Sequence, residues 1–334
     1  MKTLISMPMA ADVLAEYPPE RDLAASCREY GCDGLEVVWG GEDLPKNIPQ
    51  ALHLGYHLTF YPDWLDFWNA DQEALLRKFG SQAAWEEFYG GPAGQETLLR
   101  RYREDLDRAL GWGAEYLVFH VSDVSLEEGY TYAWEHDHQA VLAAAAQAIN
   151  LLLEGQSGDF AFLVENQWWP GFTFTNPAQT AWLLDAIRYP NKGIMLDTGH
   201  LMNANLDLKT QAEGAAYIHQ MLDDHGDLCR SIRGIHLHQS LSGAYVKGVA
   251  GQVPADLTGD YISKFCKSYG HILQIDTHRP WTDPAISSVI RRIGPEYLVH
   301  ELSAGNRAIR EERLRTQVST LHPEFHSWQV PKGF

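Results

Sequence analysis

YLVFH, residues 116–120, is a short apolar run that ends in a histidine. Similar runs that end in a histidine or a carboxylate recur along the chain: AFLVE (161–165), GIMLD (193–197), RGIHLH (233–238) and YLVHE (297–301). Each run is typical of a buried β-strand, and helical patterns separate the runs at intervals of roughly 30–65 residues. This alternation predicts an α/β fold of the (β/α)8 barrel type, in which functional residues lie at the carboxyl ends of the strands.

Three further strands complete the predicted barrel on its amino-terminal side. They are LISM (4–7), GLEVV (34–38) and LGYHL (54–58). A ninth candidate, ILQID (272–276), exceeds the positions that such a barrel offers, so we place it in an enlarged loop after the seventh strand. The amino-terminal stretch lacks the long apolar core of a signal peptide, and we expect it to form the first strand.

Two segments depart from the regular alternation of strands and helices. Residues 61–95 are too long for a simple turn after the third strand, and we expect a lid that contains a helix of its own. Residues 321–334 are predicted to form a carboxyl-terminal tail. We see no internal repeat, low-complexity tract or linker, which favours a single domain over residues 1–334.

The composition sets broad limits on the function. The chain has 334 residues, 45% of them hydrophobic, and a formal net charge of −18. This acidic balance disfavours nucleic acid as a partner, because nucleic-acid affinity depends largely on Lys and Arg. No apolar stretch reaches the ~18 residues that a membrane span needs. The four cysteines form no C-x-x-C pair, so we expect a reduced, cytoplasmic enzyme.

Four predicted strand ends carry side chains that bind divalent metal ions. Glu165 and Glu301 end the fifth and eighth strands, and Asp197 and His236 lie at the ends of the strands between them. Carboxylates and imidazoles are ligands for zinc, manganese and related ions. Buried carboxylates are costly without a positive partner, so the sequence predicts a divalent cation among these four residues.

The motif Asp197-Thr-Gly-His200 adds a family resemblance to this pattern. Together with Glu165, His236 and Glu301 at strand ends, it resembles the xylose isomerase-like TIM-barrel superfamily. Members of that superfamily include tagatose and psicose epimerases, hydroxypyruvate isomerase, inosose dehydratase and, more distantly, endonuclease IV. The resemblance spans most of the chain but is specific only at the strand ends.

The sugar epimerase branch implies a site with one divalent ion. The resemblance assigns this ion to Glu165, Asp197, His236 and Glu301. It also implies that His200 and Arg279, the latter within DTHRPW (276–281), contact the substrate. A homodimer is a further expectation from the family.

The endonuclease IV branch implies a larger site with three zinc ions. The resemblance to this branch adds five possible ligands: His57, His120, His200, Asp276 and His278. The gap from His236 to Asp276 is longer here than in the endonuclease, and its basic DNA-gripping loops have no counterpart in this sequence. The number of metal ions, from one to three, is therefore open at this point.

Aromatic residues are concentrated in the loops that follow the strand ends. Trp64 lies in the predicted lid, and Trp168 and Trp169 come shortly after Glu165. Aromatic rings pack against the C–H faces of sugars and also stack on bases. With the acidic charge balance we favour a small carbohydrate as the partner, and we expect Trp64 and Trp168 to contact it.

Three other histidines lie close to predicted site residues. His53 competes with His57, which we prefer because the sequence after it runs directly into the lid. His238 shares a face with His236 and is expected to support it or to act as an alternate ligand. His300 points to the other side of its strand, and we expect it to be structural.

These observations favour a metal-dependent sugar isomerase or epimerase. The ion would polarise a ketose carbonyl, while Glu165 and Glu301 would move the proton as general base and acid. Zinc, manganese, cobalt or magnesium would serve as the cofactor. The alternative is an endonuclease IV-like phosphoesterase with several zinc ions, and a sugar-binding barrel without catalysis is a third hypothesis.

Overall fold

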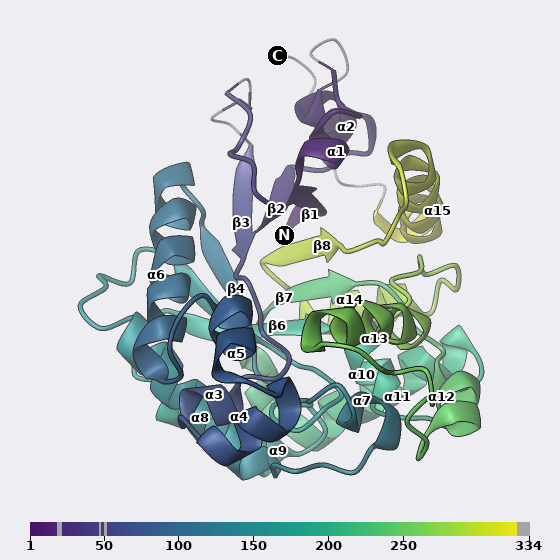
Figure 1. The fold of residues 1–334 in the computed structure, drawn as a ribbon. Helices are drawn as coiled ribbons and strands as arrows, with labels where there is room; N and C mark the ends of the chain where they lie inside the picture. Colours follow the sequence, from purple (N-terminus) through teal and green to yellow (C-terminus); the bar gives the residue numbers. More distant parts are fainter. Residues whose placement is uncertain (19–21, 47, 50–51, 326–334) are drawn as a thin grey trace.

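The computed structural model describes residues 1–18, 22–46, 48–49 and 52–325 of the chain. Within these residues, a closed barrel of eight parallel strands follows the sequence order (Figure 1). The strands are β1 (Lys2–Met9), β2 (Gly34–Trp39), β3 (His53–His57), β4 (Tyr116–His120), β5 (Ala161–Glu165), β6 (Lys192–Asp197), β7 (Ile232–Leu237) and β8 (Tyr297–His300). The predicted (β/α)8 barrel is confirmed.

The register of the strands brings the site residues to one level. His120 on β4 pairs with Glu165 on β5, and Asp197 on β6 pairs with His236 on β7. A separate apolar cluster of strand residues is fully or almost fully buried: Leu4, Tyr116, Val118, Ala161, Leu163, Met195, Tyr297 and Val299. Because side chains of this kind fill the interior of such a barrel, a ligand can approach only at the strand ends.

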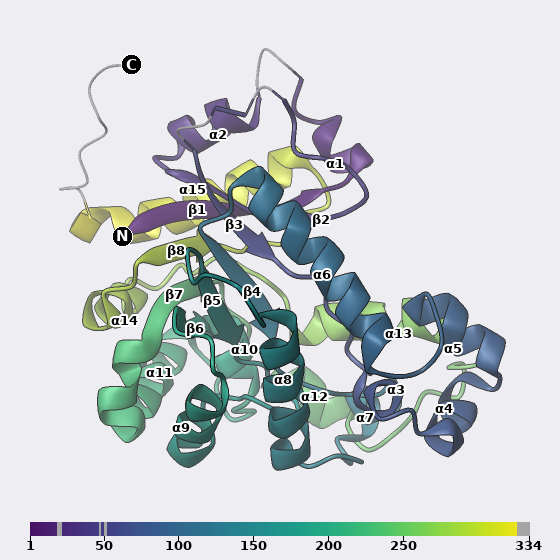
Figure 2. The ribbon, with the colours of Figure 1, turned by 90° about the vertical axis from the view of Figure 1, so that its left-hand side faces the viewer.

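Helices cover the outside of the barrel (Figure 2). They are α2 (Leu23–Glu29), α6 (Gln95–Trp112), α8 (His138–Leu152), α9 (Pro177–Ala186), α11 (Gln211–His225), α14 (Ile286–Ile293) and α15 (Arg307–Phe325). Several begin at residues that the sequence marks clearly. Asp137 caps α8, Asn176 caps α9, and Thr210 forms a capping box with Glu213 at α11. Such caps satisfy free N–H groups and fix where each connecting loop ends.

Shorter helices lie within the connections between strands. They are α1 (Ala11–Leu14), α7 (Glu128–Thr131), α10 (Thr198–Asn203), the 3-10 helix η2 (Gly226–Ser231) and α12 (Gly243–Val249). Helix α10 starts directly at the end of β6, where the Asp197 carboxylate accepts the backbone N–H of His200 at 2.6 Å. The same carboxylate is therefore both a helix cap and a candidate metal ligand.

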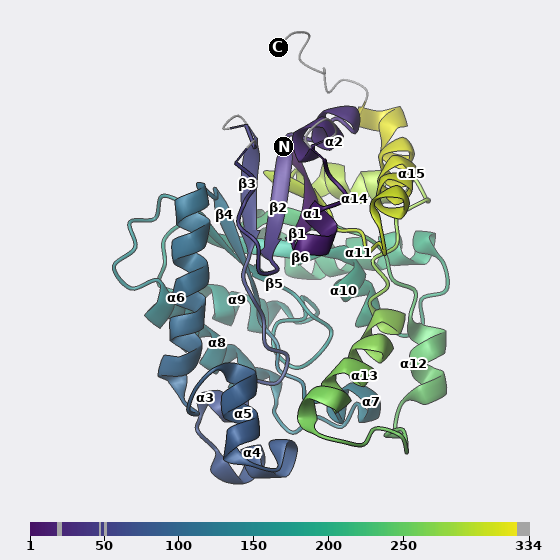
Figure 3. The same cartoon turned by 45° about the horizontal axis from the view of Figure 1, so that its top comes forward.

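Two insertions carry helices at the carboxyl end of the barrel. The segment after β3 contains α3 (Leu65–Trp68), α4 (Gln72–Phe79) and α5 (Gln82–Tyr89), and the segment after β7 contains α13 (Tyr261–Ile275). Tyr261 at the start of α13 stacks on Phe79 of α4, with ring centroids 3.8 Å apart, and its ring lies 5.0 Å from that of Phe88 of α5. The two insertions therefore pack against each other (Figure 3).

The ILQID segment is the last turn of α13 and not a strand. The buried residues of this helix are Tyr261, Ser268, His271 and Ile275, whose spacing follows a helical period. Asp260 caps its start by accepting the backbone N–H of Ser263. Asp276 follows the helix directly as its C-cap, so the end of this insertion places a carboxylate near the barrel mouth.

The predicted carboxyl-terminal tail overlaps the end of α15. Residues 321–325 belong to that helix, and residues 326–334 lie outside the described part of the chain. Among the described helices, none combines the length and the apolar character that crossing a bilayer requires.

Candidate metal centre

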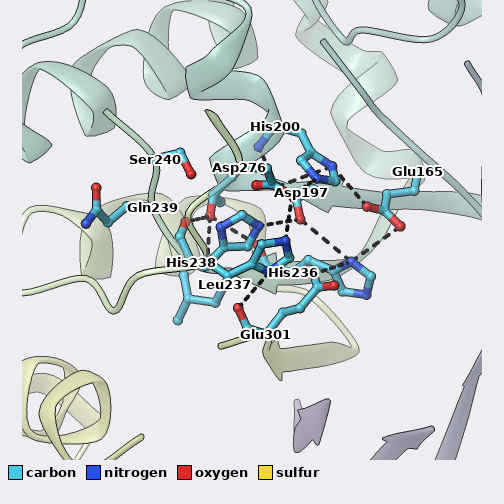
Figure 4. Close-up of polar contacts among 12 residues, drawn as sticks. Glu165, Asp197, His200, His236, Leu237, His238, Gln239, Ser240, Asp276 and Glu301 are labelled. Carbon is cyan, nitrogen blue, oxygen red and sulfur yellow. Dashed lines mark hydrogen bonds and ion pairs between the residues drawn. The ribbon is translucent and has the colours of Figure 1, made fainter. Parts of the chain in front are cut away.

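Four strand-end residues form a compact group, which we call the central set. Its members are Glu165, Asp197, His236 and Glu301, whose ligand atoms all lie within 4.8 Å of one another (Figure 4). Nδ1 of His236 lies 3.0 Å from Oε2 of Glu301 and 3.4 Å from Oε2 of Glu165. The strands thus bring together the four ligands that the sequence predicts, although they are far apart in the chain.

A second group, the first flanking set, consists of His57, His120 and Glu165. Nε2 of His57 and Nε2 of His120 lie 3.1 and 3.2 Å from the same oxygen, Oε2 of Glu165. The two imidazole nitrogens are only 3.0 Å apart. Glu165 belongs to both sets, so its carboxylate lies between two candidate ion positions.

A third group, the second flanking set, consists of His200, His238, Asp276 and His278. Oδ2 of Asp276 lies 3.1 Å from Nε2 of His200. The rings of His238 and His278 stack with centroids 4.0 Å apart. His278 has a φ of +43°, a strained backbone conformation for a residue with a side chain. Such strain persists only where the surrounding structure stabilises it, and here the strained residue contributes its imidazole to the second flanking set.

The donor sets carry more negative charge than a buried site tolerates alone. Burial raises the pKa of Glu165, but the nearby imidazoles of His120 and His236 outweigh it and hold that pKa well below its usual value. Burial likewise disfavours charged His236, yet the carboxylates of Glu301 and Glu36 raise its pKa well above the usual value. Without metal, the raised pKa of His236 favours its charged form, which offsets the carboxylates around it.

Two donors of the second flanking set have atoms that no protein group satisfies. Nδ1 of His238 and Oδ1 of Asp276 are buried and have no hydrogen-bond partner among the described residues. Nδ1 of His236 and Oε2 of Glu301, in the central set, face each other as an ion pair at 3.0 Å. Buried polar atoms in folded proteins are almost always paired, so the two unpaired atoms of the second flanking set need a partner. Imidazole and carboxylate donors suit divalent ions, which would displace the histidine protons. The residues present therefore fit a multi-ion metal centre.

A second layer of polar residues orients these ligands. Oε1 of Glu36, on β2, lies 2.9 Å from Nε2 of His236, and the Tyr116 hydroxyl donates to the other Glu36 oxygen at 2.8 Å. Nε2 of His238 lies 2.8 Å from Oδ2 of Asp197. Such contacts fix the ring orientation of a metal-binding histidine. Sequence reasoning missed Glu36, although its charge within the apolar run GLEVV was an available signal.

The structure separates His53, His238 and His300 by their positions relative to the donor sets. His57 lies at the site, whereas His53 lies at the other end of β3 and pairs with Glu115. Nδ1 of His300 accepts a hydrogen bond from the Gln317 amide at 2.8 Å, away from the donor sets. His238 lies close enough to join the second flanking set.

A cavity of about 430 Å³ opens above the donor sets. Its floor is made by the outermost ligands: His57, His120, His200, Asp276, His278 and Glu301. Glu165, Asp197 and His236 lie beneath that floor and are fully buried. Because of this depth, Glu165 would serve better to hold metal, as a member of two donor sets, than as a base that touches substrate directly.

Only one of two predicted tryptophan contacts lies at the cavity. Trp168 lines it, together with Trp169. Trp64 does not, because it packs inside the lid, 2% exposed, and its indole N–H donates to the Ser122 carbonyl at 2.7 Å. Arg279 also lies outside the lining, where it is exposed and its backbone carbonyl accepts the Gln239 N–H at 2.9 Å. The structure therefore places Trp168 at the cavity, but not Trp64 or Arg279.

The comparisons with known proteins agree with the fold. The family model of the xylose isomerase-like TIM barrel matches residues 24–317, and the chain therefore belongs to this family. No curated protein matches the sequence. Endonuclease IV from Thermus thermophilus aligns over 97% of this chain and 100% of its own, with a TM-score of 0.52 and 14% identity.

Two other solved structures are similar over their full length. L-ribulose 3-epimerase aligns over 100% of both chains, with a TM-score of 0.50 and 13% identity. The IOLI protein with a binding zinc atom aligns over 99% of this chain and 100% of its own, with a TM-score of 0.54 and 12% identity. At such identities the likeness establishes the shared barrel, and function has to be argued from the site.

Proposed function

We propose that this chain is a multi-metal phosphoesterase that acts on a small phosphoester. One observation carries the proposal: three adjoining donor sets, two of which share Glu165. A metal-dependent isomerase needs only the central set to hold its ion, so it would not use the flanking sets as further ion sites. Several ions side by side are typical of enzymes that cleave phosphoesters.

The donor sets define which residues would hold the ions. Glu165, Asp197, His236 and Glu301 would hold one ion, His57 and His120 with Glu165 a second, and the second flanking set a third. When bound, such ions supply Lewis-acid stabilisation of a phosphoryl oxygen and activation of a water molecule.

The chain's own side chains have a defined part in this chemistry. Glu301 borders the cavity, and its side chain is 16% exposed, so its carboxylate can accept a proton from an attacking water. Gln167 also lines the cavity. Its side-chain amide nitrogen lies 2.9 Å from Nδ1 of His200, and this contact holds the imidazole ring in place. The segment after β3 and α13 contribute apolar side chains, including Phe88 and Phe265, to the wall of the cavity. Such a wall lowers the amount of water around the reacting groups.

A small substrate, and not nucleic acid, agrees with the charge of the site. The residues described as lining the cavity include no lysine or arginine. Nucleic-acid binding depends on such cations along an extended surface. The formal net charge of −18 likewise disfavours nucleic acid as a substrate.

A sugar isomerase or epimerase is the second candidate. The complete central set and the aromatic lining of the cavity, which includes Phe60 and Trp168, favour it. In that case Glu301 would exchange the proton with the substrate, since Glu165 lies below the cavity floor. The additional donors of the flanking sets would then serve only to orient the central ion.

Parallel assays of the metal-loaded full chain separate the two candidates. We expect hydrolysis of bis(p-nitrophenyl) phosphate and no exchange of solvent deuterium into a panel of ketoses. Glu301→Gln should lower hydrolysis by about 100-fold or more. Glu296→Gln is the matched control near the other end of β8, where Glu296 pairs with Arg233, and it should leave the rate unchanged. Deuterium exchange into a ketose without hydrolysis would overturn the proposal.

A further inference from the structure

The cavity has two chemically unlike sides. Its floor consists of imidazoles and carboxylates from the strand ends. Its walls are largely apolar and come from the two insertions and the loops after β3 to β5, with side chains such as Phe60, Phe88, Trp168, Phe265, Tyr269 and Leu273. A ligand that places an anionic group on the floor therefore meets a hydrophobic surface immediately above it.

Helix α13 contributes the outer part of this wall. Phe265, Tyr269, Ile272 and Leu273 lie on successive turns of the helix and all line the cavity. Tyr269 is 55% exposed and Leu273 is 40% exposed. Two large apolar side chains that stay open to solvent at the mouth of a cavity form a hydrophobic surface that a ligand can cover.

The position of this wall is fixed by contacts of α13 with neighbouring elements. The Phe88 ring lies 5.5 Å from Phe265 of α13 and also lines the cavity. The Tyr245 hydroxyl lies 2.8 Å from Nδ1 of His271, and Nε2 of His271 lies 3.0 Å from the Gly129 carbonyl, so the helix is held from two further elements. A pre-formed apolar wall binds a matching group without a large cost of ordering.

The other lining residues narrow the chemistry of the ligand. Apart from the floor ligands, the described lining residues include no carboxylate, lysine or arginine, and the polar ones among them include Ser122, Ser125, Gln167 and His271. A polyol would leave most of its hydroxyls facing aromatic and aliphatic side chains. A flat or branched apolar group would instead be buried by them, and a cavity of about 430 Å³ can hold such a group beside a phosphoryl group.

We propose that the substrate carries an aryl group, or an apolar group of similar size, next to the group that binds the metal centre. The ester part of this assignment rests on the proposed function, and the apolar part rests on the cavity wall alone. The wall formed by α13 is the specificity-determining element, with Tyr269 and Leu273 at its open edge.

Binding of two non-hydrolysable probes tests the wall independently of catalysis. Phenylphosphonate and methylphosphonate present the same anionic group and differ in the apolar part. By isothermal titration calorimetry with the metal-loaded full chain, we expect phenylphosphonate to bind about 10-fold more tightly or better. Equal affinity for the two probes, or no binding of either, would overturn the proposal.

A matched pair of variants locates the effect on the helix. Leu273→Ser removes an apolar group from the lining and should reduce the preference to below about 3-fold. Ile262→Ser removes a similar group from the same helix at a site that is 45% exposed and outside the lining, and should leave the preference unchanged. Tyr269→Ser gives a second test if Leu273→Ser shows altered circular dichroism. An unchanged preference in both lining variants would contradict the assignment.

The binding preference for phenylphosphonate and the hydrolysis of the phosphodiester can fail independently of each other. If the phosphodiester is not hydrolysed but the preference for phenylphosphonate persists and depends on Leu273, the proposed function fails and the apolar specificity stands. If hydrolysis occurs without that preference, the function stands and the specificity fails.

Discussion

Histidine and carboxylate side chains lie at both ends of the barrel, but their exposure to solvent differs. Strand β3 has a histidine at each end and allows the comparison. At its amino end, His53 pairs with Glu115, which also binds Lys2. These side chains are 30 to 38% exposed. At its carboxyl end, His57 is 4% exposed and faces Glu165, which is fully buried.

The difference lies in burial and in the balance of charge. At the amino end one carboxylate meets two basic groups in contact with water, so nothing further is required. At the carboxyl end the central set alone contains three carboxylates and one imidazole, all largely withdrawn from solvent. Because burying carboxylates is costly, the carboxyl end favours a bound cation more strongly than the solvated amino end does.

The largest effect is expected when the shared ligand of the carboxyl end is changed. Glu165→Gln removes a charge that serves two donor sets, and we expect phosphodiester hydrolysis to fall by about 1,000-fold or more. Metal content should fall with it. Glu115→Gln makes the same change at the amino end and should keep both near the wild-type level. A Glu165→Gln variant with normal metal content and rate would show that the two ends do not differ in this way.

The next effect concerns pH and the buried His300. Burial lowers the pKa of His300 from 6.5 to about 4. The folded state therefore disfavours the charged ring, and the stability that neutral His300 contributes is present above pH 6.5 and lost as the pH falls through about 4. Over that range we expect the metal-free chain to lose about 3 kcal/mol through this residue.

His300→Gln provides the comparison for this pH effect. Glutamine keeps an acceptor for the Gln317 amide but does not titrate in this range. Urea unfolding of both chains at pH 7, 5.5 and 4 should show a smaller loss for the variant. Parallel curves for the two chains would mean that His300 titrates normally.

A smaller effect is expected at Gly199, within the Asp197-Thr-Gly-His200 motif. A Cβ there would lie 2.0 Å from Cε1 of His238, so the imidazole would have to move. We expect Gly199→Ala to cost about 2 kcal/mol in unfolding free energy and to weaken binding at the second flanking set. Gly111→Ala on α6, where a Cβ meets nothing within 4 Å, is the control and should be neutral or slightly stabilising. Equal stability of the two variants would contradict this packing.

The smallest effect is expected at the amino end itself. His53→Gln removes one partner from a partly exposed ion pair, and we expect a loss below about 1 kcal/mol in thermal or urea unfolding. Metal content should not change. A loss as large as that of Gly199→Ala would show that this end is not merely a solvated ion-pair cluster.

The sequence predicted the features that depend on local patterns. Apolar runs that end in a histidine or carboxylate predicted the strands and the positions of the central set, because each strand and its candidate ligand are adjacent in the chain. ILQID could not be settled that way, since a short apolar run fits either a strand or the last turn of a helix.

The remaining features depend on tertiary packing. Trp64 lies in the lid sequence, but only the folded lid shows that its ring is buried against Ser122. Arg279 lies beside the site ligand His278 in sequence, yet it is exposed. Glu36 contacts His236 although the two residues are 200 positions apart in the sequence. A local sequence pattern cannot predict a contact between residues so far apart in the chain.

The number of bound metal ions tests the central claim most directly. The full chain, purified without chelators and dialysed against metal-free buffer, can be measured by inductively coupled plasma mass spectrometry. Three donor sets predict about three divalent ions per chain, and His57→Gln should lower that number by about one while His53→Gln leaves it unchanged. A constant value of one ion per chain in all three proteins would contradict the multi-metal centre.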